Sequence, residues 1–367
     1  MKLCTFNING LIRYLKTDRN LNRLLLDNGI DICCFQETKL SGLNRDIFAI
    51  PLSNVYLNSS KSSSGYCGIG FVFKESLPLS ISIDLPGFNK NEEARYFESH
   101  FNDFILINVY VPNADLDSER FTVKENFLYF LSQRIFHLQT LNNVIIVGDF
   151  NISHCPLDSY YAKEDENFDK HPLRVWFTEF LSEHNLVDIY RHFHPTEVKY
   201  TCWNTYLDSR SSNCGSRIDY ILVNQSFLPF CNDCSILDDF HGSDHCPVVL
   251  EILDSKLSPS WRNNTLETTN NYLNYSYKSK TISDFFGLKR KTPDTTSDRQ
   301  NIAKKKTQQS TLLTHFKIEK ETVKCKCNQD CALKQVIKKG PNKGRYFYCC
   351  QMPFAVRCDF FKWQKQG

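Results

Sequence analysis

The sequence predicts an α/β domain that is followed by a linker and a small cysteine-rich domain. Four consecutive aliphatic residues at 144–147 are too few for a helix and are typical of a strand buried on both faces. Segments with helical spacing of apolar residues lie between strands of this kind, which is the pattern of an α/β protein. With 367 residues and 41% hydrophobic content, the chain can bury a substantial core.

The predicted elements follow one another along the first 253 residues. Strand-like segments lie at 2–9, 30–35, 65–74, 104–111, 144–147 and 216–223. Helical spacing marks 21–26, 125–141 and 172–186, the last of which begins with a proline. We expect Gly148 to allow a tight turn after the strand at 144–147, and the glycines at 65–70 to permit close approach of another backbone.

Composition and charge differ between the body and the tail. No apolar run is long enough to span a membrane, and the N-terminus shows no signal peptide, so we expect a soluble protein that is not secreted. Ten of the 16 cysteines are scattered among apolar residues of the body, as expected of reduced core thiols. Residues 1–253 carry a net charge of −11 and residues 254–367 a net charge of +14. The basic tail is therefore expected to supply much of the affinity for a polyanion.

Asp149 and Asn151 follow the strand at 144–147 and carry the first chemical signal. An extended backbone projects residues two apart to the same side, so we expect the carboxylate and the carboxamide to lie together. Such a pair can deprotonate a water molecule and hold it in place, as phosphoester hydrolysis requires. The alternative is a strand followed by an Asx-type turn without a catalytic role.

Similar polar residues stand at the ends of other predicted strands. Asn7 closes the first strand, Glu37 follows the strand at 30–35, and Tyr110 closes the strand at 104–111. A carboxylate among carboxamides suits a hard cation such as Mg²⁺, with Mn²⁺ as an alternative. Glu37 could also be a helix-capping acid, and Tyr110 a packing residue.

Asp219 lies among apolar residues, where an unpaired carboxylate would be costly. His245, which follows Asp244, is its expected partner. An imidazole held by a carboxylate keeps one tautomer or stays charged, and it can face a phosphate with its other nitrogen.

These polar residues belong to ordered motifs, which are Phe6-Asn7-Ile8-Asn9-Gly10, Gln36-Glu37-Thr38-Lys39, Asn108-Val109-Tyr110-Val111-Pro112-Asn113, Gly148-Asp149-Phe150-Asn151, Arg217-Ile218-Asp219-Tyr220 and Ser243-Asp244-His245-Cys246-Pro247. The set resembles the motifs of the exonuclease III family of abasic-site (AP) endonucleases and covers nearly all of residues 1–253. The resemblance implies a two-sheet α/β sandwich, the endonuclease/exonuclease/phosphatase fold, with the site at one edge. Sphingomyelinases, inositol phosphatases and DNase I share this fold, but their motifs match more loosely.

The resemblance also implies roles for the individual residues. Glu37 binds Mg²⁺ with Asn7 positioning the metal, and Asp149 activates a water molecule held by Asn151. His245, oriented by Asp219, and Tyr110 stabilise the charge that develops on the phosphate. The implied metal set is Asn7, Glu37, Asp149, Asn151, Asp244 and His245, and the implied catalytic set is Tyr110, Asp149, Asn151, Asp219 and His245.

The sequence departs from the family pattern in two places. Asn9 stands where the best-known hydrolytic members carry an Asp, which removes one negative charge near the metal. The positions that wall the abasic-sugar pocket in those members are occupied here by Cys202, Ser216 and Ile218, of which the first two are small. We therefore expect a roomier pocket, weak incision at abasic sites, and stronger removal of 3′-terminal nucleotides or blocks.

Residues 254–322 are rich in Ser, Thr, Asn and Lys, the composition of a disordered linker. The basic pair at 290–291 and the basic triplet at 304–306 predict a bipartite import signal and hence a nuclear protein. An island at 309–316 resembles the peptide box that binds the DNA sliding clamp PCNA, and a second island at 282–286 is the alternative. The clamp-binding residues of the first island would be Gln309, Leu312, His315 and Phe316.

Residues 323–367 contain six cysteines, which in so short a segment of an intracellular protein argue for tetrahedral Zn²⁺ rather than disulfides. The segment resembles the GRF-type zinc finger, with Gly344-Arg345-Tyr346-Phe347 as its signature. The resemblance implies Cys325, Cys327, Cys350 and Cys358 as ligands. Side chains suited to single-stranded DNA are Lys338, Lys339, Lys343, Arg345, Phe360 and Trp363, although a purely structural zinc domain is the alternative.

Body, linker and finger together resemble the second group of eukaryotic AP endonucleases. We therefore expect a monomeric, Mg²⁺-dependent DNA repair nuclease with 3′–5′ exonuclease or 3′-phosphodiesterase activity and weaker AP endonuclease activity, acting in base excision and single-strand break repair. The alternatives are an RNA or phosphoinositide phosphodiesterase on the same fold, and a DNA-bound adaptor whose site is weakened by Asn9.

Overall fold

The structure, a computed structural model, describes residues 1–17, 21, 23–40, 54–74, 78–258, 273–276, 324, 326, 331–335, 345–350 and 361–363. The chain divides into two compact units, Met1–Gly287 and Leu288–Gly367, which are considered separately. None of the helices in these described ranges is long and apolar enough to cross a membrane.

One sheet of the first unit has seven strands in the order β13-β14-β1-β2-β4-β3-β15. In chain order these are β1 (Lys2–Asn7), β2 (Ile32–Gln36), β3 (Asn54–Asn58), β4 (Ile69–Phe73), β13 (Cys231–Ile236), β14 (Val248–Ile252) and β15 (Leu273–Ser276). At its centre β1 and β2 run parallel.

The second sheet has six strands in the order β5-β6-β7-β8-β12-β9. They are β5 (Ser80–Ser82), β6 (Tyr96–His100), β7 (Phe104–Tyr110), β8 (Asn143–Asp149), β9 (Leu186–Asp188) and β12 (Asp219–Asn224). The neighbours β7 and β8 are parallel, and β12 is antiparallel to β8. A short pair, β10 (Cys202–Trp203) and β11 (Gly215–Ser216), lies outside both sheets.

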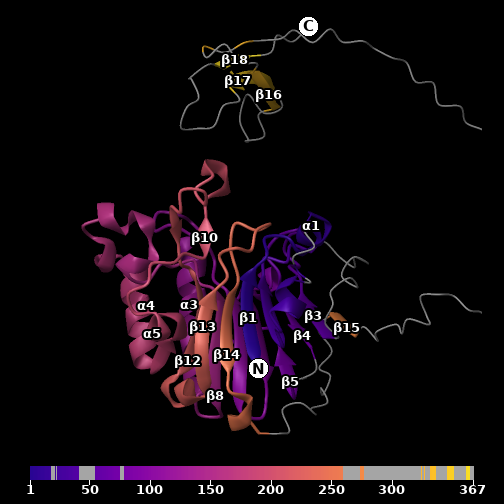
Figure 1. Cartoon of the computed structure of the whole chain (residues 1–367), viewed down its shortest axis with the longest axis vertical. Helices are drawn as coiled ribbons and strands as arrows, with labels where there is room; N and C mark the ends of the chain where they lie inside the picture. The colour runs from indigo at the N-terminus through magenta and orange to yellow at the C-terminus, as the bar shows by residue number, and fades with distance from the viewer. Residues whose placement is uncertain are drawn as a thin grey trace, which may run out of the picture. The chain divides into compact units, whose positions relative to one another are not determined.

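The helices are α1 (Leu11–Thr17), α3 (Phe121–Leu138), α4 (Pro172–Glu183) and α5 (Ile189–Phe193), with a π-helical segment at Arg23–Asp27. Short 3₁₀ turns occur at Asn91–Glu93, Pro156–Asp158, Tyr160–Glu164, Phe168–Lys170, Thr205–Leu207, Gln225–Phe230 and Asp254–Lys256. In Figure 1, α3 and α4 lie on one side of the body and α1 lies on the other.

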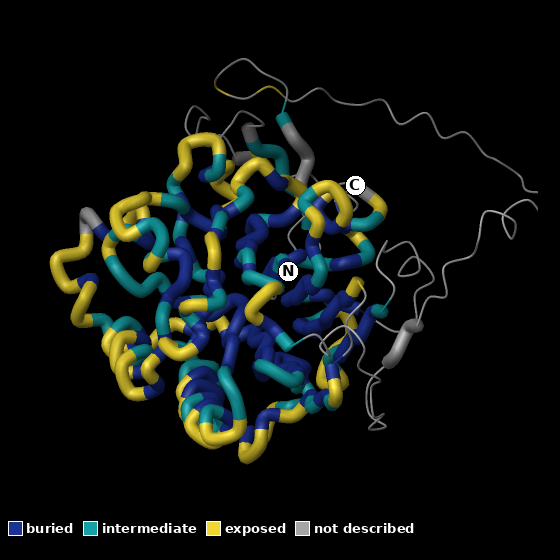
Figure 2. The backbone as a smooth tube through the Cα atoms, turned by 60° about the horizontal axis from the view of Figure 1, so that its bottom comes forward, coloured by how far each residue is buried: buried dark blue, intermediate teal, exposed yellow. Residues whose placement is uncertain are grey.

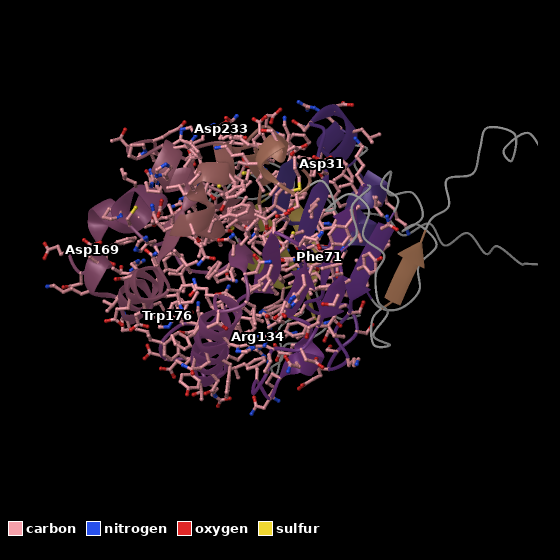
Figure 3. All side chains as sticks on the ribbon, turned by 90° about the horizontal axis from the view of Figure 1, so that it is seen from below. Asp31, Phe71, Arg134, Asp169, Trp176 and Asp233 are labelled. Atoms are coloured by element: carbon pink, nitrogen blue, oxygen red, sulfur yellow. The ribbon has the colours of Figure 1, made fainter. Side chains whose placement is uncertain are left out.

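Three apolar clusters hold these layers together. The largest lies between the two sheets, where Phe71 of β4 and Phe97 of β6 meet edge to face, and Figure 3 shows Phe71 inside the body. A second cluster packs α3 and α4 against the six-stranded sheet, and a third packs α1 against the seven-stranded sheet. Figure 2 shows buried residues at the centre and exposed residues mostly around them. The expected two-sheet α/β sandwich is confirmed.

Two glycines are required by close contact between strands. A Cβ at Gly148 would lie 2.0 Å from the Val109 carbonyl oxygen, and the residue has a φ of +133°. The expected turn at Gly148 is wrong, because β8 continues to Asp149 and the glycine instead admits the backbone of β7. At Gly70 a Cβ would lie 3.0 Å from the Tyr56 carbonyl oxygen and 2.5 Å from the Leu57 side chain, so the expected close approach of another backbone is confirmed there.

Several predicted elements differ in extent. The strand expected at 65–74 covers only Ile69–Phe73, and the helix expected at 21–26 is π-helical. The strand expected at 216–223 is interrupted at 217–218, where Arg217 is buried and pairs with Asp158 and Asp188. The segment expected to be disordered contains β15, which pairs with β3 and covers an otherwise open sheet edge.

The second unit contains a three-stranded antiparallel sheet of β16 (Cys331–Gln335), β17 (Tyr346–Cys350) and β18 (Phe361–Trp363). The Arg345 guanidinium lies 4.2 Å from the centre of the Trp363 ring, so two of the residues expected to bind DNA are neighbours. Outside the described residues lie Cys325, Cys327, Cys358, Lys338, Lys339, Lys343, Phe360, the clamp-binding residues and both basic clusters. The side chain of Cys350 also lies outside them.

Candidate active site

Strand direction gathers the predicted site residues at one edge of the sandwich. Asn7 and Gln36 end the parallel strands β1 and β2, and Glu37 follows directly. Tyr110 and Asp149 end the parallel strands β7 and β8 at the same register position. Because β12 is antiparallel to β8, its first residue, Asp219, lies opposite Asp149. Carboxyl ends of parallel strands form one edge, so these side chains converge there.

The amide of Asn7 links two of the carboxylates. Its Nδ2 donates to Glu37 Oε1 at 3.1 Å and to Asp149 Oδ2 at 2.9 Å. Its Oδ1 accepts the backbone N–H of Asn9 at 3.1 Å. Asn7 is fully buried, so it holds both carboxylates in a fixed relation.

Glu37 is held by donors on both oxygens. The Tyr110 hydroxyl donates to Oε1 at 2.7 Å, and the Lys39 ammonium lies 2.5 Å from Oε2. Burial alone would raise the pKa of Glu37, but Lys39, Asn7 and Tyr110 outweigh burial and hold that pKa below its usual range. Burial and the neighbouring carboxylates raise the pKa of Tyr110 well above its usual range, so the phenol stays neutral and donates.

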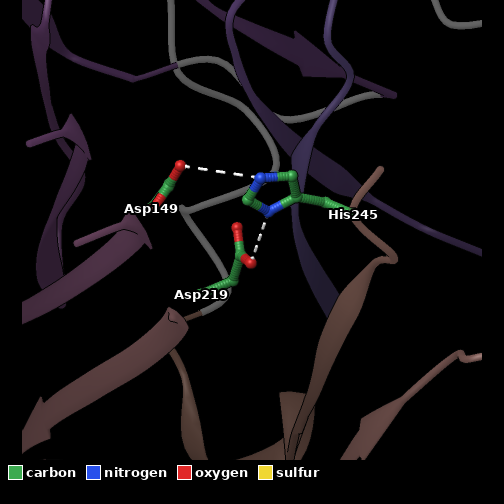
Figure 4. A group of neighbouring side chains, drawn as sticks. All are labelled: Asp149, Asp219 and His245. Atoms are coloured by element: carbon green, nitrogen blue, oxygen red, sulfur yellow. Dashed lines mark hydrogen bonds and ion pairs between the residues drawn. The ribbon is translucent and has the colours of Figure 1, made fainter. Parts of the chain in front are cut away.

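Asp149, Asp219 and His245 form a buried cluster (Figure 4). His245 Nδ1 lies 2.8 Å from Asp219 Oδ2, which confirms the expected pairing, and Nε2 lies 3.9 Å from Asp149 Oδ2. Burial opposes protonation of His245, yet Asp219 raises its pKa well above the ordinary value, so the ring is an imidazolium. Burial and the charge of Asp219 raise the pKa of Asp149 to about 7.

Asn151 differs from its expected geometry. It lies beyond the end of β8 with a φ of +51°, so its side chain is not placed by an extended backbone. Its backbone N–H donates to Asp149 Oδ1 at 2.8 Å, which is the Asx-type turn considered as the alternative. The carboxamide Nδ2 donates to the Val111 carbonyl at 3.0 Å, and Lys124 Nζ donates to the Asn151 carbonyl at 3.0 Å. Asn151 still faces the pocket beside Asp149.

Asn9 connects Asp244 to Lys39. Its Nδ2 donates to Asp244 Oδ1 at 2.8 Å, and its Oδ1 accepts from Lys39 Nζ at 2.5 Å. Asp244 therefore joins the site through Asn9, and no direct contact with Glu37 is needed to place it. Lys39 and Lys124 were not predicted as site residues, because nothing in sequence spacing distinguishes them from ordinary surface lysines.

A pocket with a volume of about 770 Å³ opens beside the cluster. It is lined by Cys202, Ser216 and Ile218, the three expected wall residues, together with Asn151 and Asp244. Cys202 and Ser216 are register partners on β10 and β11. The structure thus brings the three predicted wall residues to one cavity together with Asn151 of the predicted catalytic set.

A hard divalent cation fits the carboxylate side of this site. Glu37 and Asp149 supply oxygen ligands, and the Asn7 amide holds the two carboxylates together. Ligand atoms of Asp149, Asp219 and His245 also lie within 4.8 Å of one another. Glu37 and Asp149 would hold the cation, with Asn7 positioning them.

Comparison with known proteins assigns both parts of the chain to families. The model of the endonuclease/exonuclease/phosphatase family matches residues 4–245. The chain belongs to this family. A second model, the GRF zinc finger, matches residues 323–367, as the cysteine pattern predicted.

The relatives of this family member are nucleases. The chain is 27% identical to DNA-(apurinic or apyrimidinic site) endonuclease 2 of Xenopus laevis, over 99% of this chain and 98% of that protein. It is 33% identical to an exodeoxyribonuclease of Bacillus subtilis, over 69% of this chain and 99% of that protein. The predicted enzyme class, a nuclease of the phosphodiesterase type, is confirmed.

Solved structures agree with this assignment. The catalytic domain of Xenopus laevis APE2 superposes with a TM-score of 0.60 at 31% identity, covering 69% of this chain and 91% of that one. The 3′ phosphatase NExo from Neisseria, bound to product DNA hairpin, superposes with a TM-score of 0.61 at 26% identity, covering 69% and 99%. Both matches support the two-sheet fold described above.

Proposed function

We propose that this chain is a Mg²⁺-dependent DNA repair nuclease that removes 3′-terminal nucleotides or 3′ blocks and incises abasic sites more weakly. Mn²⁺ is a possible substitute for Mg²⁺. The observation that carries the proposal is the convergence of Glu37, Asp149 and His245 at one edge of the sandwich. The wall residues of the adjoining pocket, Cys202 and Ser216, are small.

Asp149 acts as the base that takes a proton from the attacking water. A pKa of about 7 suits this task, because the carboxylate is substantially ionised at neutral pH and still basic enough to accept the proton. Asn151, fixed by Val111 and Lys124, lies beside Asp149 and holds the water in place. Glu37 would hold a Mg²⁺ ion, which would supply positive charge to the phosphate.

His245 stabilises the charge that develops on the phosphate. Asp219 fixes Nδ1 and keeps the ring charged, so Nε2–H is available as a charged donor. The family resemblance implies that the Tyr110 hydroxyl contacts the phosphate, but in this structure it donates a hydrogen bond to Glu37. We infer that Tyr110 orients Glu37 and reaches the phosphate only after that bond is exchanged.

The pocket supports the preference for 3′ ends. A volume of about 770 Å³ bounded by Cys202 and Ser216 accommodates a nucleotide that still carries its base, whereas a narrow apolar pocket would favour a bare sugar. The proposal also includes the pathway and the location: the protein would act as a monomer in base excision and single-strand break repair in the nucleus. Residues 309–316 would bind PCNA, and the finger would bind Zn²⁺ and single-stranded DNA.

The test is a set of matched substrates assayed with Mg²⁺: a duplex with an internal abasic site, a recessed 3′ end, a 3′-phosphate end, an RNA duplex and a phosphoinositide. The proposal predicts fastest hydrolysis at the 3′ ends and slower incision at the abasic site. Preference for RNA or phosphoinositide would contradict the substrate class, and absence of hydrolysis on every substrate would favour the adaptor. Replacing Leu312 and Phe316 by alanine should abolish PCNA binding, and a loss confined to changes at 282–286 would select the other island.

A further inference from the structure

Arg95 is a buried guanidinium in direct contact with Tyr110, and the mechanism described above gives it no role. Its side chain is only 3% exposed. Arg95 Nη1 donates to the Tyr110 carbonyl at 3.2 Å, and Cζ lies 4.6 Å from the centre of the Tyr110 ring. The Arg95 carbonyl accepts the Tyr110 backbone N–H at 2.9 Å. One arginine therefore contacts both the backbone and the ring of the tyrosine whose hydroxyl donates to Glu37.

Two further side chains fix the Arg95 guanidinium. Its Nε donates to Glu93 Oε2 at 2.6 Å, and its Nη2 donates to the Tyr66 hydroxyl at 2.9 Å. Glu93 is also buried, and Arg120 donates to its two oxygens at 3.1 and 2.9 Å. Between Glu93 and Arg95, Ala94 has a left-handed backbone with a φ of +55°, and this turn lets residues two apart form an ion pair. The planar guanidinium thus has a separate partner for each of its nitrogens.

A cation held in this way acts on Tyr110 in two respects. Attraction between the guanidinium and the face of the aromatic ring favours one position of the ring. A nearby positive charge also stabilises negative charge on the phenol oxygen, which makes the hydroxyl a stronger donor. Burial and the neighbouring carboxylates raise the pKa of Tyr110, and Arg95 opposes that rise.

We propose that Arg95 is a positioning residue for hydrolysis, which holds Tyr110 where its hydroxyl donates first to Glu37 and then to the phosphate. This inference rests on the role given to Tyr110 in the proposed function. A buried arginine–glutamate pair can also serve the fold alone. The chain offers a pair for comparison, because Arg134 binds both oxygens of the buried Glu98, and neither residue belongs to the candidate site.

The experiment is a double-mutant cycle on the full chain. Arg95→Lys is made alone and together with Tyr110→Phe, which removes only the hydroxyl. Lysine keeps the positive charge but cannot reproduce the planar set of hydrogen bonds to Glu93, Tyr66 and the Tyr110 carbonyl. Tyr66→Phe is a milder second variant that leaves the Arg95–Glu93 ion pair intact, and Arg134→Lys is the matched control.

Three quantities are measured for each form. They are kcat on a recessed 3′ end at saturating Mg²⁺, Mn²⁺ affinity from the electron paramagnetic resonance signal of the free ion, and thermal unfolding. The Mn²⁺ affinity reports the orientation of Glu37 without requiring hydrolysis. Thermal unfolding shows which variants are folded.

The effect of Arg95 should depend on the Tyr110 hydroxyl. Arg95→Lys should lower kcat about tenfold in the wild-type background and less than about twofold in the Tyr110→Phe background. Tyr66→Phe should lower kcat about threefold, again only while the hydroxyl is present. Mn²⁺ affinity should fall about threefold or more in Arg95→Lys and in Tyr110→Phe, and no further in the double variant. Arg134→Lys should change stability but neither kcat nor Mn²⁺ affinity.

The same fold-loss of kcat in both backgrounds would overturn the proposal, because Arg95 would then act independently of the hydroxyl. Equal losses in Arg95→Lys and Arg134→Lys would also overturn it, since both pairs would then serve the fold alone. A wild-type chain that hydrolyses no DNA end would refute the nuclease function instead. The Mn²⁺ series would still decide whether Arg95 acts through Tyr110.

Discussion

Asp149 on β8 and Asp219 on β12 are register partners, so two buried carboxylates stand directly opposite each other across neighbouring strands. Like charges placed in this way destabilise one another unless a cation or a proton intervenes. His245 supplies one positive charge through its bond to Asp219, and burial together with the charge of Asp219 raises the pKa of Asp149 to about 7. The protein thus retains an unfavourable charge arrangement at the position where the proposed mechanism places its base.

The first prediction is that Asp149→Asn stabilises the metal-free protein. The pKa of Asp149 is raised from 3.8 to about 7, so folding binds a proton and stability falls as pH rises from about 4 through 7. Above pH 7.5 the amide should increase the free energy of unfolding by about 2 kcal/mol. Removing the buried negative charge stabilises the fold by more than this, but loss of the hydrogen bond from Asn7 offsets part of that gain. Thermal unfolding at pH 5 and pH 8 in chelator-treated buffer measures this, and a variant less stable than wild type at pH 8 would refute it.

Glu37→Gln should lower hydrolysis at limiting Mg²⁺ and recover part of the activity at high Mg²⁺. The amide keeps the size of the side chain but removes the charge that would bind the cation. Initial rates over a Mg²⁺ titration, with the exposed Glu179→Gln as control, provide the measurement. A variant whose loss is the same at every Mg²⁺ concentration would show that Glu37 serves orientation only.

Filling the pocket should shift the balance of activities. Burying a large side chain against an abasic sugar is worth about 1.5–3 kcal/mol, or roughly one to two decades in rate if realised in the transition state. Cys202→Phe combined with Ser216→Trp should therefore raise abasic-site incision relative to exonuclease activity on matched duplexes. If the ratio stays the same or falls in a folded variant, pocket volume does not set the preference, and Asn9 becomes the next residue to change.

Deleting residues 323–367 should weaken binding to single-stranded DNA and flatten its salt dependence. Each phosphate neutralised by the finger contributes about 0.7 to the slope of log K against log salt. Fluorescence anisotropy over a salt series compares the full chain with the deletion. An unchanged slope would place the DNA-binding charge outside the finger.

The sequence predicted which residues converge at the candidate site more successfully than it predicted how each of them is oriented. Asp219 could be paired with His245 because a carboxylate among apolar residues must find a partner, and the 2.8 Å bond bears this out. Asn151 was expected on an extended backbone, but a φ of +51° turns it, which no spacing rule reveals. The contact between Lys39 and Asn9 could not be predicted for a similar reason, because it depends on a left-handed backbone conformation at both residues.

The strands of the fold also differ in how well the sequence predicts them. The buried strands β7 and β8 could be recognised from continuous aliphatic runs, because both faces of each strand are covered. The strand β6 was not predicted, and its residues Glu98, Ser99 and His100 are polar. Glu98 is nevertheless buried, where Arg134 binds both of its oxygens, and that partner is distant in sequence.

The central claim is that Asp149 is the base for hydrolysis, and the direct measurement is single-turnover cleavage of a recessed 3′ end by Asp149→Asn, beside its affinity for the same DNA. Asp169→Asn, at the surface in Figure 3, is the control for the substitution itself. The account predicts that Asp149→Asn binds DNA about as well as wild type while cleavage falls by about four decades or more, as expected when a base is removed together with a charge at the metal. Cleavage within about tenfold of wild type by the folded variant would contradict the mechanism.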